Sequence, residues 1–109
     1  MTFYVYLIKT FESEFNTHRY KIGMTNNIKK RKSQLDRQSP YPLVFLKTYK
    51  FNTKAEAVKI EKSLHNFFSK ERIMRYGKPT EWFNFISETV AINKVDEWLQ
   101  ILYKANIIY

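Results

Sequence analysis

Two charged side chains stand on helical faces that are otherwise apolar, and the first of them is Arg31. It follows Ile28 by three residues and precedes Leu35 by four, a spacing that places all three on one face of a helix. A guanidinium held on such a face needs an acceptor, and phosphate is a good one because it can accept two parallel hydrogen bonds. The alternative is an arginine whose stem packs at the edge of the stripe while its charged head reaches solvent. Taken alone, the spacing favours this second interpretation.

Glu61 repeats the anomaly on a second predicted helix, three residues before Leu64 and seven before Phe68. A carboxylate on an apolar stripe costs free energy unless it is paired or binds a cation. It could form a buried ion pair, for instance with Arg31, or hold Mg²⁺, which often takes only one or two protein carboxylates. His65 lies one turn later on the same face, where a lone histidine is more often a hydrogen-bonded packing residue than a catalyst.

Tyr6, Lys21 and Gly23 stand on the faces of two predicted strands that lie opposite the purely apolar faces. If the strands pair as a hairpin, Tyr6 and Lys21 could border one groove with Arg31. Buried tyrosines with a satisfied hydroxyl are common, and so are lysines on half-solvated sheets, so neither residue alone predicts a site. Gly23, one of two glycines in the chain, is more telling, because a glycine inside a strand often marks the close approach of other backbone or of a ligand.

Three strands are predicted to position these residues. Aromatic and β-branched residues favour strands at 3–8 and 19–24, which we expect to pair antiparallel across a polar connection at 10–18. Residues 43–51 predict a third strand after a proline-containing turn. The resulting sheet is short and mostly antiparallel.

Helices are predicted at 28–38 and 54–70, each preceded by asparagine or threonine side chains that can satisfy free backbone N–H groups. Residues 72–78 indicate a basic loop, and 80–85 a compact aromatic segment. The final amphipathic helix, 88–104, could complete the core or form the face of a homodimer. The predicted order is ββαβαα, an α+β domain.

Composition narrows the class of protein. A chain of 109 residues that is 44% hydrophobic and 17% aromatic suits one compact domain and not a disordered tail. Its net charge of +9 attracts polyanions, with nucleic acid the commonest partner and an anionic membrane surface the main rival. The absence of cysteine excludes disulfides, thiolate zinc sites and a cysteine nucleophile. Without a visible signal peptide or membrane span, we expect an intracellular protein of the cytoplasm or nucleus, in a cell or an infected one, with no membrane partner.

Together these residues resemble the GIY-YIG nuclease superfamily, and within it the branch found in phages and large viruses. The matching motifs occur in order, as Y-x-Y at 4–6, Y-K-I-G-x-T at 20–25, arginine at 31, E-x-x-x-H at 61–65 and E-W-F at 81–83. The resemblance spans about residues 3–84 and implies a layered α/β/α fold with a central three-stranded antiparallel sheet. We therefore expect one domain over 1–109, to which the final helix is an addition.

The resemblance also implies roles for individual residues. Glu61 would hold one divalent ion, Mg²⁺ or Mn²⁺, and Tyr6 would be the general base or position the attacking water. Arg31 would bind the scissile phosphate and offset charge in the transition state. Lys21 stands where many members have a second tyrosine, and it could lower the pKa of the Tyr6 hydroxyl. The expected structural motif comprises Gly23, Glu81, Trp82 and Asn84.

Two departures from the family pattern bear on the chemistry. Tyr4 replaces the glycine of the first motif, and Leu35 replaces a histidine often found one turn after the arginine. A proton relay through that position would need a substitute, for which Tyr20 and His65 are the candidates.

The predicted function is therefore metal-dependent hydrolysis of nucleic-acid phosphodiester bonds, in DNA rather than RNA, by an endonuclease of low intrinsic sequence specificity. One alternative is a non-catalytic nucleic-acid-binding domain that keeps the fold. Another is a small interaction protein that binds a partner through its aromatic face and last helix. The basic residues expected to contact nucleic acid are Lys29, Lys30, Lys32, Arg37, Arg72, Arg75 and Lys78.

Overall fold

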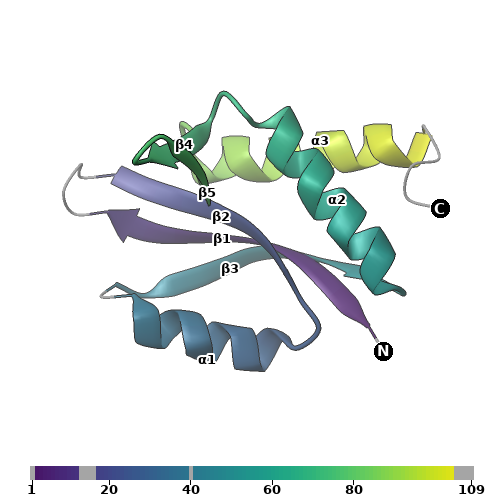
Figure 1. Ribbon diagram of the computed structural model, residues 1–109, viewed down its shortest axis with the longest axis horizontal. Helices are drawn as coiled ribbons and strands as arrows, with labels where there is room; N and C mark the ends of the chain where they lie inside the picture. The colour runs from purple at the N-terminus through teal and green to yellow at the C-terminus, as the bar shows by residue number, and fades with distance from the viewer. Residues whose placement is uncertain (1, 13–16, 40, 105–109) are drawn as a thin grey trace.

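One β-sheet has a single helix on one side and two helices on the other (Figure 1). The structure, a computed structural model, describes residues 2–12, 17–39 and 41–104. The elements in chain order are β1 (Phe3–Glu12), β2 (Thr17–Thr25), α1 (Ile28–Gln38), β3 (Leu43–Phe51), α2 (Lys54–Phe67), β4 (Arg72–Arg75), β5 (Lys78–Phe83) and α3 (Glu88–Lys104). The α+β class and the α/β/α layering follow from this arrangement.

The sheet has five antiparallel strands in the order β3-β1-β2-β5-β4, so the predicted three-stranded sheet is wrong. The expected antiparallel pairing of the first two strands is confirmed. The additional strands form where a basic loop and an aromatic segment were expected. Tyr76 and Gly77 both adopt positive φ, 54° and 75°, and they join β4 to β5 in a tight hairpin. The single glycine in this segment was not enough to predict the hairpin from the sequence.

Element boundaries differ from the prediction at three places. β1 continues to Glu12 and β2 begins at Thr17, so much of the expected polar connection at 10–18 is strand, and residues 13–16 lie outside the described part of the chain. α2 ends at Phe67, short of residue 70. The next residue, Phe68, leaves helical geometry and is only 2% exposed, because its ring is drawn into the core. The helices beginning at Ile28 and Glu88 have the predicted bounds.

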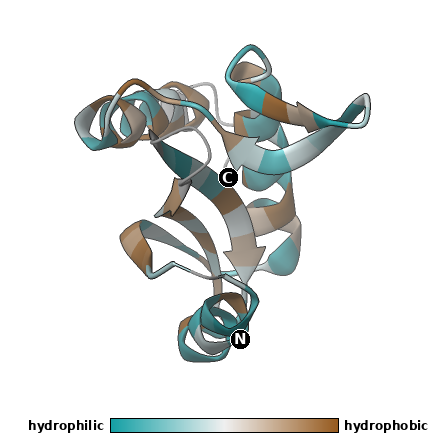
Figure 2. Ribbon diagram, turned by 90° about the vertical axis from the view of Figure 1, so that its left-hand side faces the viewer, coloured by the Kyte–Doolittle hydropathy of each residue, from teal (hydrophilic) through white to brown (hydrophobic). Residues whose placement is uncertain are grey.

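Alternation along the strands divides the buried side chains between two layers. Val5, Leu7 and Ile22 point to α2 and α3, and belong to a cluster of fifteen buried residues. Tyr6 and Ile8 point to α1, in a cluster with only four buried residues in the described chain. Hydrophilic and hydrophobic stretches share each helix in Figure 2, as expected when one helical face packs on a sheet.

The last helix completes the larger of these clusters. Ala91, Val95, Leu99 and Leu102 of α3 are all 5% exposed or less and belong to the same cluster as the strand residues. Of the two roles that the sequence left open for this helix, the structure thus shows the core role.

Candidate active site

The ladder between β2 and β5 is short. Tyr20 pairs with Phe83 and Lys21 with Trp82, and within the described residues the ladder goes no farther along β2. The carbonyl of Ile22, the next residue, accepts a hydrogen bond from a side chain of α2 instead. The edge of β2 beyond Lys21 is therefore a place where side chains from both helical layers can come together.

Tyr6 lies across Gly23 of the neighbouring strand. The two residues are directly opposite in the β1–β2 ladder, and a Cβ atom at position 23 would be only 2.5 Å from the Tyr6 ring carbon Cζ. The tyrosine is 1% exposed and its ring lies 5.4 Å from that of Phe45. The close approach that a strand glycine suggested is thus made by a side chain of the protein itself, which needs the missing Cβ for its position.

Arg31 reaches the same place from α1. Its helix is anchored by Asn27, whose side chain accepts a hydrogen bond from the backbone N–H of Lys30. The guanidinium donates to the Tyr6 hydroxyl, while its Nε is buried and has no hydrogen-bond partner among the described residues. A buried donor without an acceptor costs free energy, so this guanidinium is suited to an acceptor that arrives from solution.

Glu61 approaches from the opposite layer, on α2. Burial raises the pKa of the Glu61 carboxyl, nearby Glu81 raises it further, and the charges of Lys21 and Arg31 act in the opposite direction. Arg31 and Glu61 also both act on the pKa of Tyr6. Side chains from β1, α1 and α2, remote in the chain, therefore share one electrostatic neighbourhood.

Lys21 is directed at Glu81 and not at the tyrosine. Its Nζ lies 3.3 Å from a Glu81 carboxylate oxygen and 5.6 Å from the centre of the Trp82 ring. Burial raises the pKa of Tyr6 to about 12, and the cation that opposes this rise is Arg31. The expected lowering of the tyrosine pKa by Lys21 is thus not found, because the ammonium pairs across the β2–β5 ladder. Tyr6 is a neutral phenol at physiological pH.

An open depression of about 350 Å³ is lined by Glu61 and Glu81. In the part of the chain that the structure describes, no three or more His, Cys, Asp or Glu side chains group closely enough to hold a metal ion by themselves. Two neighbouring carboxylates next to open space nevertheless fit Mg²⁺, which prefers oxygen ligands and keeps several waters. The same donor set does not suit zinc, which prefers nitrogen and sulfur.

The comparison with known protein families shows one matching family. Residues 3–102 match the T5orf172 domain, which is most of the chain and includes nearly all of α3. The chain belongs to the T5orf172 domain family. T5orf172 is a phage-associated domain reported in nuclease-related families, which agrees in outline with a nucleic-acid function. Neither the curated proteins nor the solved structures contain a match. None of the T5orf172 domain's described helices combines the length and apolar character needed to cross a bilayer.

His65 of the T5orf172 domain has both ring nitrogens engaged by protein atoms. Nε2 donates to the Ile22 carbonyl at 2.8 Å, which leaves Nδ1 to accept from Nη2 of Arg72 at 3.4 Å. Burial lowers the pKa of this imidazole, so the neutral form is favoured. The imidazole links α2 to the edge of β2 beyond Lys21, which β5 leaves uncovered. It thereby positions Glu61, one turn earlier on the same helix.

Tyr20 lies on the other face of the sheet from Tyr6. It is 3% exposed, and its ring meets that of Phe85 edge-on at 5.7 Å. Burial raises the pKa of its hydroxyl, and its charged neighbours are Lys9 and Glu88. The structure does not bring Tyr20 together with the groups around Gly23, because neighbouring strand residues point to opposite faces.

The basic residues fall into two groups. Exposed cations stand on α1 and on the β4–β5 hairpin, and they are Lys29, Lys30, Lys32, Arg37, Arg75 and Lys78. Arg72 differs, since its Nε donates to the Thr80 carbonyl at 2.6 Å and its guanidinium lies 5.9 Å from the Phe83 ring centre. Asn84 is exposed, and its backbone N–H donates to the Glu71 carbonyl at 2.8 Å.

Sequence reasoning placed Glu81 and Trp82 in a structural motif and missed their position beside Lys21 and Glu61. The signal was the alternation of residues 80–83, in which Thr80 and Trp82 point one way along a strand while Glu81 and Phe83 point the other. Once β5 is a strand beside β2, a second carboxylate at the site follows from the pairing.

Proposed function

We propose that this T5orf172 domain is a divalent-metal-dependent endonuclease of the GIY-YIG type. It would hydrolyse phosphodiester bonds in nucleic acid, in DNA in preference to RNA. The family supports a nuclease-related role in general terms. The reaction requires a placed water, neutralisation of charge on the phosphate, and stabilisation of the leaving oxygen.

The observation that carries the proposal is the buried Arg31 Nε without a partner, beside a tyrosine hydroxyl and in the same neighbourhood as Glu61. A purely structural arginine would be expected to have its donors satisfied. A phosphate at the edge of β2 would accept charge-assisted hydrogen bonds from this guanidinium. Charge that develops on the phosphate would then lie next to a guanidinium already held in place.

Tyr6 would act as a neutral hydroxyl. With a pKa of about 12 it carries a negligible phenolate fraction near pH 7, which disfavours the role of general base in the free protein. Its oxygen accepts from Arg31, so its own proton can be donated to a second oxygen. This supports the other role implied by the family resemblance, which is to position the attacking water.

Glu61, with Glu81 beside it, would hold Mg²⁺ or Mn²⁺. The bound ion would supply Lewis-acid polarisation of a phosphate oxygen and would lower the pKa of a coordinated water. Lys21 pairs with Glu81 and balances one of the two carboxylates, which leaves Glu61 as the more available ligand. Exposed lysines on α1 would steer the polyanion towards this edge of the sheet.

The test is nicking of supercoiled plasmid in Mg²⁺, with EDTA as the metal-free control. Glu61→Gln keeps the size of the side chain and removes its charge, so metal-dependent nicking should disappear. Glu97→Gln is the matched control, because it makes the same chemical change at an exposed position on α3 and should leave nicking intact.

If the wild-type protein binds plasmid in a salt-sensitive way but does not nick it in Mg²⁺ or in Mn²⁺, the proposed nuclease activity is rejected. That result would favour the non-catalytic nucleic-acid-binding domain. Nicking that survives in Glu61→Gln would reject Glu61 as the metal ligand.

A further inference from the structure

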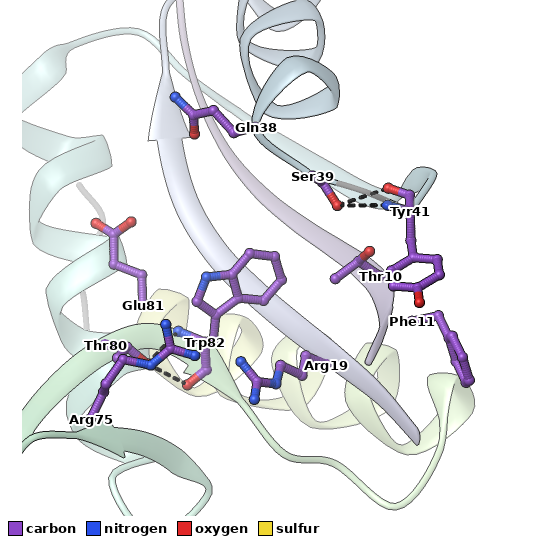
Figure 3. A pocket seen from close by; sticks show the side chains of 10 residues that line it. All are labelled: Thr10, Phe11, Arg19, Gln38, Ser39, Tyr41, Arg75, Thr80, Glu81 and Trp82. Carbon is purple, nitrogen blue, oxygen red and sulfur yellow. Dashed lines mark hydrogen bonds between the residues drawn. The ribbon is translucent and has the colours of Figure 1, made fainter. Parts of the chain in front are cut away.

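A second, larger cavity lies next to the candidate active site, on the α1 side of the sheet. It has a volume of about 500 Å³ and lies between the turn that follows α1 and the strand β5 (Figure 3). Trp82 projects into its centre, with Arg19 beside the indole and Tyr41 with Phe11 across from it. Of the residues that line it, only Glu81 has a role in the reaction proposed above.

The cavity borders the proposed catalytic neighbourhood at two side chains. Glu81 lines both this cavity and the depression beside Glu61. Trp82 carries the ammonium of Lys21 over its ring at 5.6 Å. A ligand in the cavity would therefore contact Glu81, which acts on the pKa of Glu61, and Trp82, which lies under Lys21.

The lining of the cavity combines aromatic rings with arginines. Phe11 and Tyr41 support each other edge-on at 5.6 Å and form one wall, while the indole of Trp82 stands opposite. Arg19 from β2 and Arg75 from β4 add positive charge from two strands. Flat rings that accept stacked bases, alternating with cations that meet phosphates, are typical of sites for single-stranded nucleic acid.

A regular duplex does not match this lining. Its bases are stacked inside the helix and paired, so a duplex presents mostly phosphate and sugar to a concave protein surface. The exposed cations on α1 suffice for such backbone contacts. The aromatic side chains that line the cavity can stack on a base only if that base leaves the duplex.

We propose that this cavity receives an unpaired nucleotide next to the phosphate to be cleaved, so that the preferred substrate contains a single-stranded segment. The nucleobase would stack on Trp82, and Arg19 and Arg75 would meet the neighbouring phosphates. This inference rests on the proposed function, since it names the substrate class of the same site.

The two tryptophans allow a direct test by fluorescence. Trp82 lies in the cavity, whereas Trp98 lies on α3 in the opposite layer, stacked on Phe67 with ring centres 3.9 Å apart. Trp98→Phe leaves Trp82 as the single reporter, and its emission should be quenched by a single-stranded oligothymidylate in EDTA. Quenching should be much weaker with a duplex of equal length, and with a strand of equal length whose sugars lack bases.

Trp82→Phe is the matched control, since it leaves only Trp98 and should show no quenching by any oligonucleotide. An oligouridylate arm compares RNA with DNA, and quenching by either supports the cavity. Binding followed by anisotropy should also show Trp82→Leu weakening single-strand affinity by about 5- to 150-fold, the range expected for one lost base stack, with duplex affinity little changed. Retained duplex binding shows that this variant is folded.

The outcomes separate this inference from the proposed function. Metal-dependent nicking together with unquenched Trp82, or with equal quenching by the duplex and the base-free strand, would overturn the cavity and leave the nuclease standing. Absence of binding to any nucleic acid would overturn both.

Discussion

The two faces of the sheet differ in what covers them. Among the described residues, two helices cover one face over a cluster of fifteen buried residues, whereas a single helix covers the other face over a cluster of four. The first cluster is hydrophobic, and the buried polar His65 packs against it with its ring 5.3 Å from that of Phe83. On the second face lie Tyr6, Lys21 and the partly covered Arg31, and the cavity beside Trp82 opens there.

This difference suggests a division of labour between stability and chemistry. Burial of apolar area is the main source of folding free energy, so the face under α2 and α3 should carry most of it. A thinly covered face has room for polar groups whose hydrogen bonds are incomplete, such as the Nε of Arg31. Each of the following changes tests whether stability and activity separate in this way.

The largest effect on stability is expected from Leu99→Ala in α3, a helix that carries none of the groups proposed to act on the phosphate. Leu99 is buried in the large cluster, so the free energy of unfolding should fall by about 2–5 kcal/mol in urea denaturation. Cleavage per folded molecule should change little. Leu35→Ala in α1 should cost less stability and more activity, because its helix carries Arg31. Equal losses of activity in the two variants would contradict the proposed division.

Arg31→Lys should lower the plasmid nicking rate by roughly 10²–10³-fold, because the ammonium keeps the charge but loses the planar fork proposed to bind the phosphate. The matched control is Arg37→Lys on the same helix, where the arginine is exposed and its Nε donates to the Ser33 carbonyl. Its nicking rate should stay close to that of the wild type. If both variants lose activity alike, α1 contributes only general positive charge.

Gly23→Ala should reduce both stability and cleavage, since its new Cβ would collide with the Tyr6 ring and displace the hydroxyl. The expected cost is about 1–3 kcal/mol of unfolding free energy. Gly77→Ala serves as the comparison, because it strains a backbone with φ of 75° but meets no atom within 4 Å. It should lose stability alone, and full activity in Gly23→Ala would remove Tyr6 from the mechanism.

The smallest expected effect is a pH-dependent gain in melting temperature for Glu61→Gln in EDTA. The pKa of Glu61 is raised by burial, so between the unfolded and folded pKa values the folded protein binds more protons. The free energy of unfolding contributed by this group therefore falls as pH rises through that window. Glu61→Gln should melt higher than the wild type above the window, and the difference should vanish below the ordinary glutamate pKa. Added Mg²⁺ should raise the wild-type melting temperature only.

Much of the local structure was predictable from the sequence. The helix over Ile28–Gln38 and the strand over Leu43–Phe51 have the bounds that caps, prolines and β-branched residues indicate. The helix that begins at Lys54 starts as predicted, with the Thr53 side chain accepting from the Glu56 backbone N–H. In each case the deciding interactions lie within a few residues along the chain.

The hairpin of β4 and β5 was not predictable in the same way. Its strands are short, and its turn places Tyr76 in a left-handed conformation that asparagine or glycine usually adopts. It forms because Phe83 is buried in the core and its strand pairs with β2, a segment some sixty residues earlier in the chain. The free energy gained by burying Phe83 and pairing its strand with β2 depends on a surface that exists only after the rest of the sheet has assembled.

The amino-acid sequence by itself determined which residues are out of place, namely an arginine and a glutamate on apolar helical stripes and a glycine in a strand. It determined this because amphipathic periodicity is local. Only the tertiary structure decided what these residues meet: Tyr6 over Gly23, Arg31 on the tyrosine hydroxyl, and Glu61 near Glu81 at the uncovered edge of β2. Their electrostatic neighbourhood is set by distance in space, which the packing of helices on opposite faces of one sheet establishes.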